Sequence, residues 1–305
     1  MNAVASKLVN GLLSVKPLAD FAKSKARAKM MNRAETLGIH WRDEVKALQA
    51  RDEWEAELAD VTNPDVSYPD YYLTSFHAYD EGNMGWLPAM EVDVAARAVH
   101  ARIWSDERGG INGDASLRES YHQVLKETLP TTPESIVDLG CGAGRSTITL
   151  QQTFPNATLT GIDLSPYFVA VAKHTAPQIA QNQSENISWI HAPAEETGLP
   201  SSSVDLVSVC LVFHELPTSA AKNIIAEAHR IVKPGGHFAI MDMNPKSETF
   251  LKMPPYILTL LKSTEPYLDH YFALDMTEAF REAGFEEPRI VVNSPRHRTI
   301  VGRRL

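Results

Sequence analysis

The sequence predicts a doubly wound α/β fold, because strand-like and helix-like segments alternate through the C-terminal half of the chain. The first strand is expected at Ile136–Leu139, where apolar residues surround Asp138. A glycine-rich loop follows, and Arg145–Phe154 has the pattern of a helix. Glycine tolerates a positive φ and lets the backbone approach a ligand closely. The loop is therefore the first candidate for a ligand-binding segment.

A second strand, expected at Thr158–Ile162, ends at Asp163, about 20 residues beyond the loop. An acidic residue at this place is suited to accept hydrogen bonds from ribose hydroxyls. The dinucleotide pattern requires a third small residue where this chain has Arg145, which is too bulky for close helix–strand packing. Asp138 is a poor neighbour for a pyrophosphate and a good one for a cationic ligand. These features favour S-adenosylmethionine over a nicotinamide dinucleotide.

Further strands are expected at Ile187–His191, Val204–Phe213 and His237–Met243, with a final antiparallel pair at Ile290–Asn293 and Thr299–Arg303. The fourth strand is mostly apolar, as in a strand that is buried on both faces. Helices are expected from Thr218, as N-cap, to Val232, and from Thr277 to Ala283. Between them, residues 245–275 form a proline- and aromatic-rich insertion.

Four segments lie in order over about residues 134–243: VDLGCGAGRST, GIDLSP, VDLVSVCLVFHEL and RIVKPGGHFAIMD. Together they resemble the motifs of class I S-adenosylmethionine (SAM)-dependent methyltransferases, specifically the small-molecule group typified by ubiquinone- and menaquinone-biosynthesis enzymes. The resemblance implies a Rossmann-like, seven-stranded sheet with an antiparallel last strand. It also implies in-line transfer of a methyl group from SAM to a small, aromatic or lipophilic acceptor.

By this resemblance, the glycine loop and the strand ends form the cofactor site. Asp163 would accept hydrogen bonds from the ribose, Leu164 would lie against the adenine, and Asp138 would lie near the amine. For Asp138 the alternative is a carboxylate that braces the loop or caps the helix. Relatives often have an acid where this chain has Pro193, so backbone groups or Glu195 would hold the adenine. The predicted cofactor residues are Asp138, Gly140, Cys141, Gly142, Gly144, Asp163, Leu164, Ala194, Glu195 and Cys210.

His214 is the candidate catalytic residue, because it follows the fourth strand in the loop that faces the methyl group in this family. An imidazole there could take a proton from the acceptor; the alternative is a histidine that holds the loop by hydrogen bonds. Cys141, near a helix start, has either a lowered pKa or a loop-filling role. The two cysteines lack zinc-ligand spacing, and no metal is expected. The predicted acceptor contacts are Tyr79, Tyr121, His214, Tyr267 and Tyr271.

Aromatic residues gather in residues 62–88 and again in the insertion 245–275. They either line a lid that shields an apolar acceptor from water or pack the N-terminal region against the rest of the chain. A non-catalytic SAM-binding module and a protein methyltransferase are the alternative functions. The net charge of −9 disfavours a nucleic-acid partner.

Three regions are expected: a basic amphipathic segment at 1–33, a mostly helical cap region at 34–130, and the SAM-binding domain at 131–305. Residues 1–33 hold seven Lys and Arg residues against one acid, Asp20. This segment could contact an anionic membrane surface, act as a targeting peptide, or pack on the domain.

Within the cap region, helices are expected over 34–60, over Met90–Trp104, and from a cap at Asp114 or Ser116 to about Leu129. Two cysteines give no disulfide framework, which favours a reducing, cytoplasmic location, with organelle targeting or peripheral membrane attachment as alternatives. No apolar run approaches the ~18 residues of a membrane span. The oligomeric state is not predicted.

Overall fold

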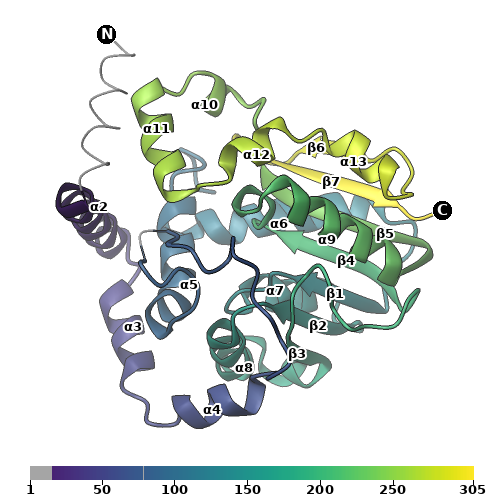
Figure 1. Cartoon of the computed structure of the whole chain (residues 1–305), viewed down its shortest axis with the longest axis horizontal. Helices are drawn as coiled ribbons and strands as arrows, with labels where there is room; N and C mark the ends of the chain where they lie inside the picture. Colours follow the sequence, from purple (N-terminus) through teal and green to yellow (C-terminus); the bar gives the residue numbers. More distant parts are fainter. Residues whose placement is uncertain (1–15, 78) are drawn as a thin grey trace.

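The computed structural model describes residues 16–77 and 79–305, and over these residues it confirms the doubly wound α/β fold (Figure 1). The strands form one seven-stranded sheet in the order β3-β2-β1-β4-β5-β7-β6. Strands β1 to β5 run parallel, and β7 is antiparallel to both β5 and β6. The Rossmann-like architecture with an antiparallel last strand is thus as the sequence predicts.

The strands are β1 (Ser135–Leu139), β2 (Thr158–Asp163), β3 (Ile187–His191), β4 (Val204–Cys210), β5 (Val232–Met243), β6 (Arg289–Val292) and β7 (His297–Arg303). Strand β4 ends three residues earlier than expected. The chain turns at Leu211, whose φ is +62°, and enters a short 3₁₀ turn at Phe213–Glu215. Strand β5 begins earlier than expected, because Val232 already pairs with Val204 before an irregularity in the register.

The helices are α2 (Lys16–Thr36), α3 (Trp41–Gln49), α4 (Trp54–Val61), α5 (Trp86–His100), α6 (Gly113–Thr128), α7 (Arg145–Thr153), α8 (Pro166–Ala180), α9 (Thr218–Ile231), α10 (Glu248–Leu251), α11 (Pro255–Thr264), α12 (Leu268–Ala273) and α13 (Met276–Glu282). Residues 34–60 are therefore divided among three helices instead of one. Gly38, with φ +81°, lies in the turn between the first two of them.

Two predicted N-caps are wrong. Helix α6 already begins at Gly113, and neither Asp114 nor Ser116 caps it. Asp114 instead accepts a hydrogen bond from Arg118 on the next turn, because a buried carboxylate and a buried guanidinium satisfy one another. Thr218 is the first residue of α9, which follows Pro217.

Alternate residues of the central strands pack against helices on opposite faces of the sheet. On one face, residues such as Val207 and Val209 pack with α9 and α13; on the other, Leu206 packs with α6 and α7. This alternation follows from the period of two along a strand. It explains why the central strands are apolar almost throughout.

The N-terminal helices build a third cluster beside the sheet. Trp41 of α3, Trp54 of α4 and Met90 of α5 pack against Phe168 of α8. Arg145, at the start of α7, forms a bidentate ion pair with Asp93 of α5, at 2.6 and 2.8 Å. The helices at the left of Figure 1 are therefore joined to the sheet by apolar packing and by a charged pair.

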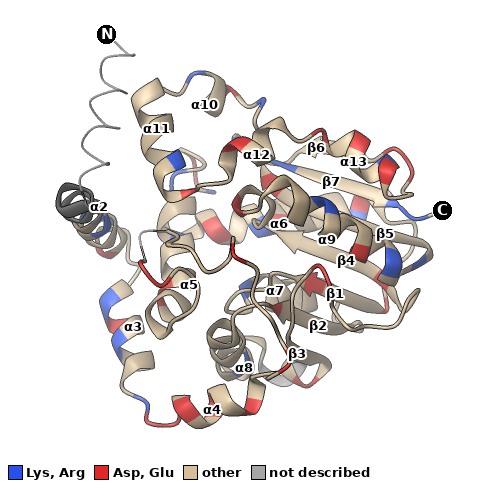
Figure 2. Cartoon of the chain, in the orientation of Figure 1, with Lys and Arg blue, Asp and Glu red and all other residues tan. Residues whose placement is uncertain are grey.

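The predicted basic amphipathic segment at 1–33 lies only partly within the described residues, because residues 1–15 fall outside them. Acidic and basic residues are interspersed over the helices and loops (Figure 2), as in the ion pair between Lys222 and Glu282. Among the helices of residues 16–77 and 79–305, none combines the length and apolarity that crossing a membrane requires.

Substitution of Phe280 tests the packing that holds β5 and α13 together. The Phe280 ring stacks on Phe238 at 5.2 Å between centroids and lies 5.3 Å from Phe285, with no exposed surface. We expect Phe280→Ala to lower the free energy of unfolding by about 3–5 kcal/mol, because it leaves a cavity. The exposed Val292→Ala in β6 is the control, expected to change stability by less than about 0.5 kcal/mol. Urea unfolding measures both, and equal losses would contradict this account of the core.

Candidate active site

The glycine loop at the end of β1 has left-handed backbone geometry at each predicted glycine. The φ angles are +68° at Gly140, +53° at Gly142 and +86° at Gly144. A side chain on Gly140 or Gly144 would collide with Val212 or Trp189, whereas a Cβ on Gly142 would meet no protein atom within 4 Å. The loop thus packs tightly at its ends and is open in its middle, as a backbone cradle for a ligand requires.

Asp163, at the end of β2, faces this open part of the loop. One carboxylate oxygen accepts the Gly142 amide and the other accepts the Ser165 amide, both at 2.8 Å. Burial raises the pKa of Asp163 to about 6, although these amides favour the charged form. Each oxygen keeps a further lone pair that can accept a hydroxyl hydrogen bond.

Asp138 lies behind the loop and is almost fully buried. Its Oδ2 accepts hydrogen bonds from Ser146 at 2.6 Å and Thr147 at 2.7 Å, at the start of α7. These contacts fit the loop-bracing alternative that the sequence left open. Oδ1 has no hydrogen-bond partner among the described residues, and burial raises the pKa of this carboxyl to about 6. A carboxylate that is half satisfied in a buried site fits a cationic ligand, so the two roles are compatible.

The other predicted cofactor residues lie around the same edge of the sheet. Leu164 is buried directly after Asp163, and Ala194 is partly buried against the core. Glu195 accepts a hydrogen bond from the Tyr71 hydroxyl. Burial raises the pKa of both cysteine thiols, well above the usual range for Cys141 and to about 12 for Cys210. The lowered pKa considered for Cys141 is therefore wrong, because desolvation of the thiolate outweighs the nearby helix start.

Arg118, which no sequence motif marks, lies at the same edge of the sheet. It is buried on α6, and its Nη1 lies 3.6 Å from the Cys210 sulfur at the end of β4. Asp114 accepts from its Nε at 3.0 Å and lies 2.7 Å from the Nδ1 of His100. A buried guanidinium is thus held at the sheet edge by a buried carboxylate. Only the packing of α6 against the sheet brings Arg118 to the end of β4.

A strap of irregular chain, residues 62–85 between α4 and α5, crosses the carboxyl ends of the strands (Figure 1, dark blue). Near its start, the Asn63 amide donates to Nδ1 of His191 in β3. Farther along the strap, burial raises the pKa of Tyr72, and the nearby carboxylates of Asp163 and Glu215 raise it further. The strap therefore covers the cofactor end of the site and continues towards the loop after β4.

His214 lies in the 3₁₀ turn after β4 and is 5% exposed. Its Nδ1 lies 2.8 Å from Oδ1 of Asp242, and its amide donates to Oδ2 at 3.2 Å. Since a carboxylate can only accept, the Nδ1 carries a proton and Nε2 is left for another partner. Burial disfavours the charged imidazole, but Asp242 and the nearby Glu265 and Glu215 outweigh it and raise the pKa of His214 to about 10.

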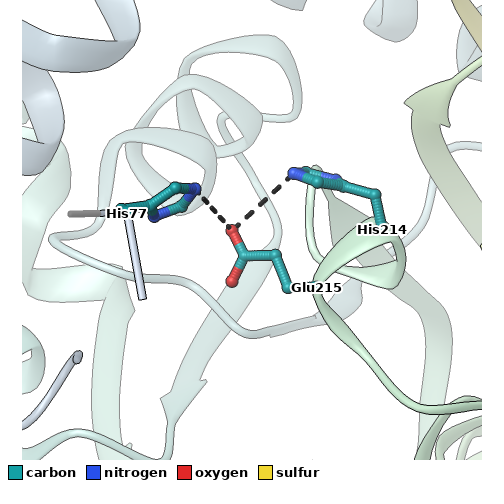
Figure 3. A group of neighbouring side chains, drawn as sticks. All are labelled: His77, His214 and Glu215. Carbon is teal, nitrogen blue, oxygen red and sulfur yellow. Dashed lines mark ion pairs between the residues drawn. The ribbon is translucent and has the colours of Figure 1, made fainter. Parts of the chain in front are cut away.

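Nε2 of His214 faces a small group of ionisable side chains from separate elements (Figure 3). Oε1 of Glu215 lies 3.8 Å from it and 3.7 Å from Nε2 of His77, which the strap supplies. His77 also pairs at 2.8 Å with Glu265, between α11 and α12. The strap, the β4 loop and the insertion therefore meet at this point.

The predicted acceptor tyrosines separate into two groups. Tyr267 of the insertion lies edge to face with Tyr71 of the strap, with centroids 6.3 Å apart. Tyr271 is buried and donates to the Met243 carbonyl at 2.7 Å, and Tyr79 donates to Glu91 under the N-terminal helices. Tyr121 is buried in the sheet core, with its hydroxyl 2.9 Å from Ser208. The hydroxyls of Tyr79, Tyr121 and Tyr271 are thus paired with other groups of the protein. Of the four predicted tyrosines, only Tyr267 contacts both the strap and the insertion.

The sequence also holds a signal for Asp242. It is the last residue but one of the apolar strand β5, at the carboxyl edge of the parallel sheet where Asp163 ends β2. His77 lies within the aromatic-rich stretch at 62–88, and no sequence pattern distinguishes it or Glu265 from the other ionisable residues of the chain.

Residues 136–236 match the family model that describes a methyltransferase domain. The chain therefore contains a segment similar to a methyltransferase domain over these residues. It is 32% identical over 148 residues to an uncharacterized methyltransferase of Synechocystis sp., over 48% of this chain and 65% of that protein. It is 31% identical over 158 residues to a ubiquinone biosynthesis O-methyltransferase of Acinetobacter baylyi, over 50% of this chain and 63% of that protein.

The chain spans less than two thirds of the length of these curated relatives. A Nostoc punctiforme protein described as an O-methyltransferase has the same fold, with a TM-score of 0.54 and 15% identity. That likeness covers 83% of this chain and 68% of the other. Together these comparisons confirm the methyltransferase domain that the sequence motifs predict.

Gly142 tests whether the open part of the loop receives the cofactor. We expect Gly142→Ala to weaken binding of S-adenosylhomocysteine at least about tenfold, equivalent to about 1.4 kcal/mol, because the methyl group enters the open space. Gly110→Ala is a matched control, since Gly110 also has a positive φ, +60°, with no atom within 4 Å of a Cβ. Both variants should lose about 1–2 kcal/mol of stability. Calorimetric titration that shows equal affinity in the two variants would contradict this assignment.

The raised pKa of Asp163 predicts that cofactor binding depends on pH. Hydroxyl donors favour the charged carboxylate, so binding lowers a pKa that is about 6 in the ligand-free chain. Below pH 6 a proton must therefore be released on binding, and affinity should fall by up to about tenfold per pH unit for this group. Titration between pH 5 and 7 measures the slope, with Asp163→Asn expected to bind weakly and to show a smaller slope. Constant wild-type affinity over this range would refute the prediction.

Proposed function

We propose that this protein transfers a methyl group from SAM to a small acceptor that is aromatic or lipophilic. The observation that carries the cofactor half of this proposal is the facing pair of Asp163 and the open Gly142 backbone. Bound SAM supplies a methyl group already activated by the positive sulfur. The protein therefore has to bind SAM and the acceptor, align them with one another and exclude water.

Three buried charged groups provide complementary contacts for the cofactor. Asp163 accepts hydrogen bonds from ribose hydroxyls through the lone pairs that the amides leave free. Oδ1 of Asp138 meets the amino group, which provides the partner that the folded chain lacks. Arg118 meets the carboxylate, because its guanidinium is held at the end of β4 beside Cys210. The glycine loop supports the methionine part, and Leu164 contacts the adenine.

The acceptor half is formed where strap and insertion meet above the loop after β4. Tyr71 and Tyr267 supply an aromatic contact between them, and His214 presents Nε2 from below. Aromatic walls of this kind favour a flat or apolar acceptor. The Acinetobacter relative, named for ubiquinone biosynthesis, supports an acceptor of this chemical class. His214 is proposed to hydrogen-bond the reacting atom of the acceptor through Nε2. Because the pKa of His214 is about 10 in the ligand-free chain, it does so as a donor, which favours the deprotonated form of the acceptor.

Methyl transfer itself is tested by measuring S-adenosylhomocysteine formation from SAM with a panel of lipophilic phenols, quinols and small hydrophilic acids. We expect turnover with a lipophilic phenol or quinol, and at least about a 100-fold loss of kcat/KM in His214→Gln, within the range of proton-transfer catalysis. His174→Gln on α8 is the control, since this histidine contacts Trp54 and lies outside the site.

Cofactor binding measured on the same preparations separates the two halves of the proposal. A chain that binds S-adenosylhomocysteine but methylates none of the panel would contradict the proposed acceptor class. Activity that survives unchanged in His214→Gln would remove this residue from the catalytic role.

A further inference from the structure

His77, His214 and Glu215 bring three ligand atoms together from two segments far apart in the sequence. One atom from each side chain lies within 4.8 Å of the others. Figure 3 shows the two imidazoles on either side of Oε1 of Glu215. Two imidazoles and a carboxylate form the donor set that three-ligand zinc sites use.

The separations fit a common ion. Bonds of about 2.1 Å to one metal place two of its ligand atoms roughly 3 to 4 Å apart. Oε1 of Glu215 lies 3.7 Å from Nε2 of His77 and 3.8 Å from Nε2 of His214. Neither separation is a hydrogen-bond distance, so these two contacts do not occupy the ligand atoms. Nε2 of His77 does lie 2.8 Å from Oε1 of Glu265, so a cation would displace the proton that this pair shares.

The surrounding groups support the ligands in the way that metal sites do. Asp242 holds Nδ1 of His214 at 2.8 Å, and a ligating histidine usually donates its other ring N–H to such a carboxylate. His77 is held with φ +47° beside the bridge between Phe76 and Tyr79. A non-glycine residue in this conformation persists only where its surroundings determine it, and such positions cluster at functional sites.

The surroundings of Glu265 are a second observation that points to a cation site. This residue is 6% exposed, and its Oε1 lies 2.8 Å from Nε2 of His77. Its Oε2 is buried and has no hydrogen-bond partner among the described residues. A buried carboxylate oxygen without a partner is costly, and a bound ion beside it would remove that cost.

We propose that His77, His214 and Glu215 bind one divalent transition-metal ion, with Glu265 as an adjoining carboxylate. Two neutral imidazoles and two carboxylates balance the charge of such an ion. The mixed nitrogen and oxygen donors select Zn²⁺ and similar ions over Mg²⁺ and Ca²⁺, which prefer oxygen donors alone.

The ion would lie at the acceptor end of the site, where strap, β4 loop and insertion meet. Three protein ligands leave a coordination position for an oxygen of the acceptor, and a bound hydroxyl there would have a lowered pKa. His214 would then meet the acceptor through the ion. This role rests on the proposed methyl transfer, whereas the binding of the ion does not.

Co²⁺ is the probe for the test, because its visible absorption reports ligand type and geometry. The full chain is freed of metal with a chelator and titrated with Co²⁺. We expect one equivalent to bind with a spectrum typical of four or five nitrogen and oxygen ligands, and Zn²⁺ to displace it. His77→Gln and Glu215→Gln should each weaken binding more than about tenfold, and Asp242→Asn about 10- to 100-fold.

His40→Gln is the matched control, because His40 is an exposed histidine before α3. Thermal unfolding of each variant without metal verifies that it is folded. Failure of the wild type to bind Co²⁺, or binding that is equal in His77→Gln, Glu215→Gln and His40→Gln, would overturn the metal site.

Titration of the metal-free protein with S-adenosylhomocysteine separates this outcome from failure of the proposed function. A chain that binds the nucleoside and methylates an acceptor without any metal keeps the proposed function and removes the ion from the reaction, whereas the Co²⁺ titration alone decides whether the ion binds. If methyl transfer stops when the metal is removed and returns when Zn²⁺ is added, the proposed function and the role of the ion in it are both supported.

Discussion

A hydrogen bond from the Gly142 amide to the Asp163 carboxylate ties together the carboxyl ends of the two neighbouring strands β1 and β2. It requires a left-handed backbone at Gly142, which only glycine adopts without strain. It also fixes the loop from which α7 starts, and Arg145 at that start pairs with Asp93 of α5. The position of the cofactor cradle and the attachment of the N-terminal helices thus depend on the same short segment of chain.

The site is formed at a cost to stability. Burial raises the pKa of Asp138 and of Asp163 to about 6, above the usual value for an aspartate, so the folded chain disfavours their charged forms at neutral pH. Both groups bind protons more readily in the folded than in the unfolded chain. Their contribution to stability is therefore greatest below about pH 4 and is lost as the pH rises through 6. A ligand with a positive charge and hydroxyl donors stabilises the charged forms, so the ligand-free site is prepared for binding.

The acceptor end depends on chain segments that have no regular structure or only short helices. The strap supplies His77, the turn after β4 supplies His214 and Glu215, and the insertion supplies Glu265. Opposite charges and the aromatic pair of Tyr71 and Tyr267 draw these segments together. A long backbone hydrogen bond, from the His77 amide to the Thr264 carbonyl at 3.4 Å, also joins the strap to the insertion. Closure of this end therefore depends mainly on side-chain contacts. Substrate or ion binding is therefore expected to order it further.

The sequence alone determined the fold and predicts the cofactor half of the site, since both depend on local patterns: apolar strands, glycines at a left-handed turn, and an acid at a strand end. Asp163 and the glycine loop needed only spacing along the chain. The contacts of Arg118, His77 and Glu265 were decided by the tertiary structure, because each approaches the site from an element distant in sequence. Tyr121 shows the converse, since a tyrosine predicted to meet the acceptor is buried beneath β4. Local periodicity determines where a strand ends, but only packing determines which distant side chains meet there.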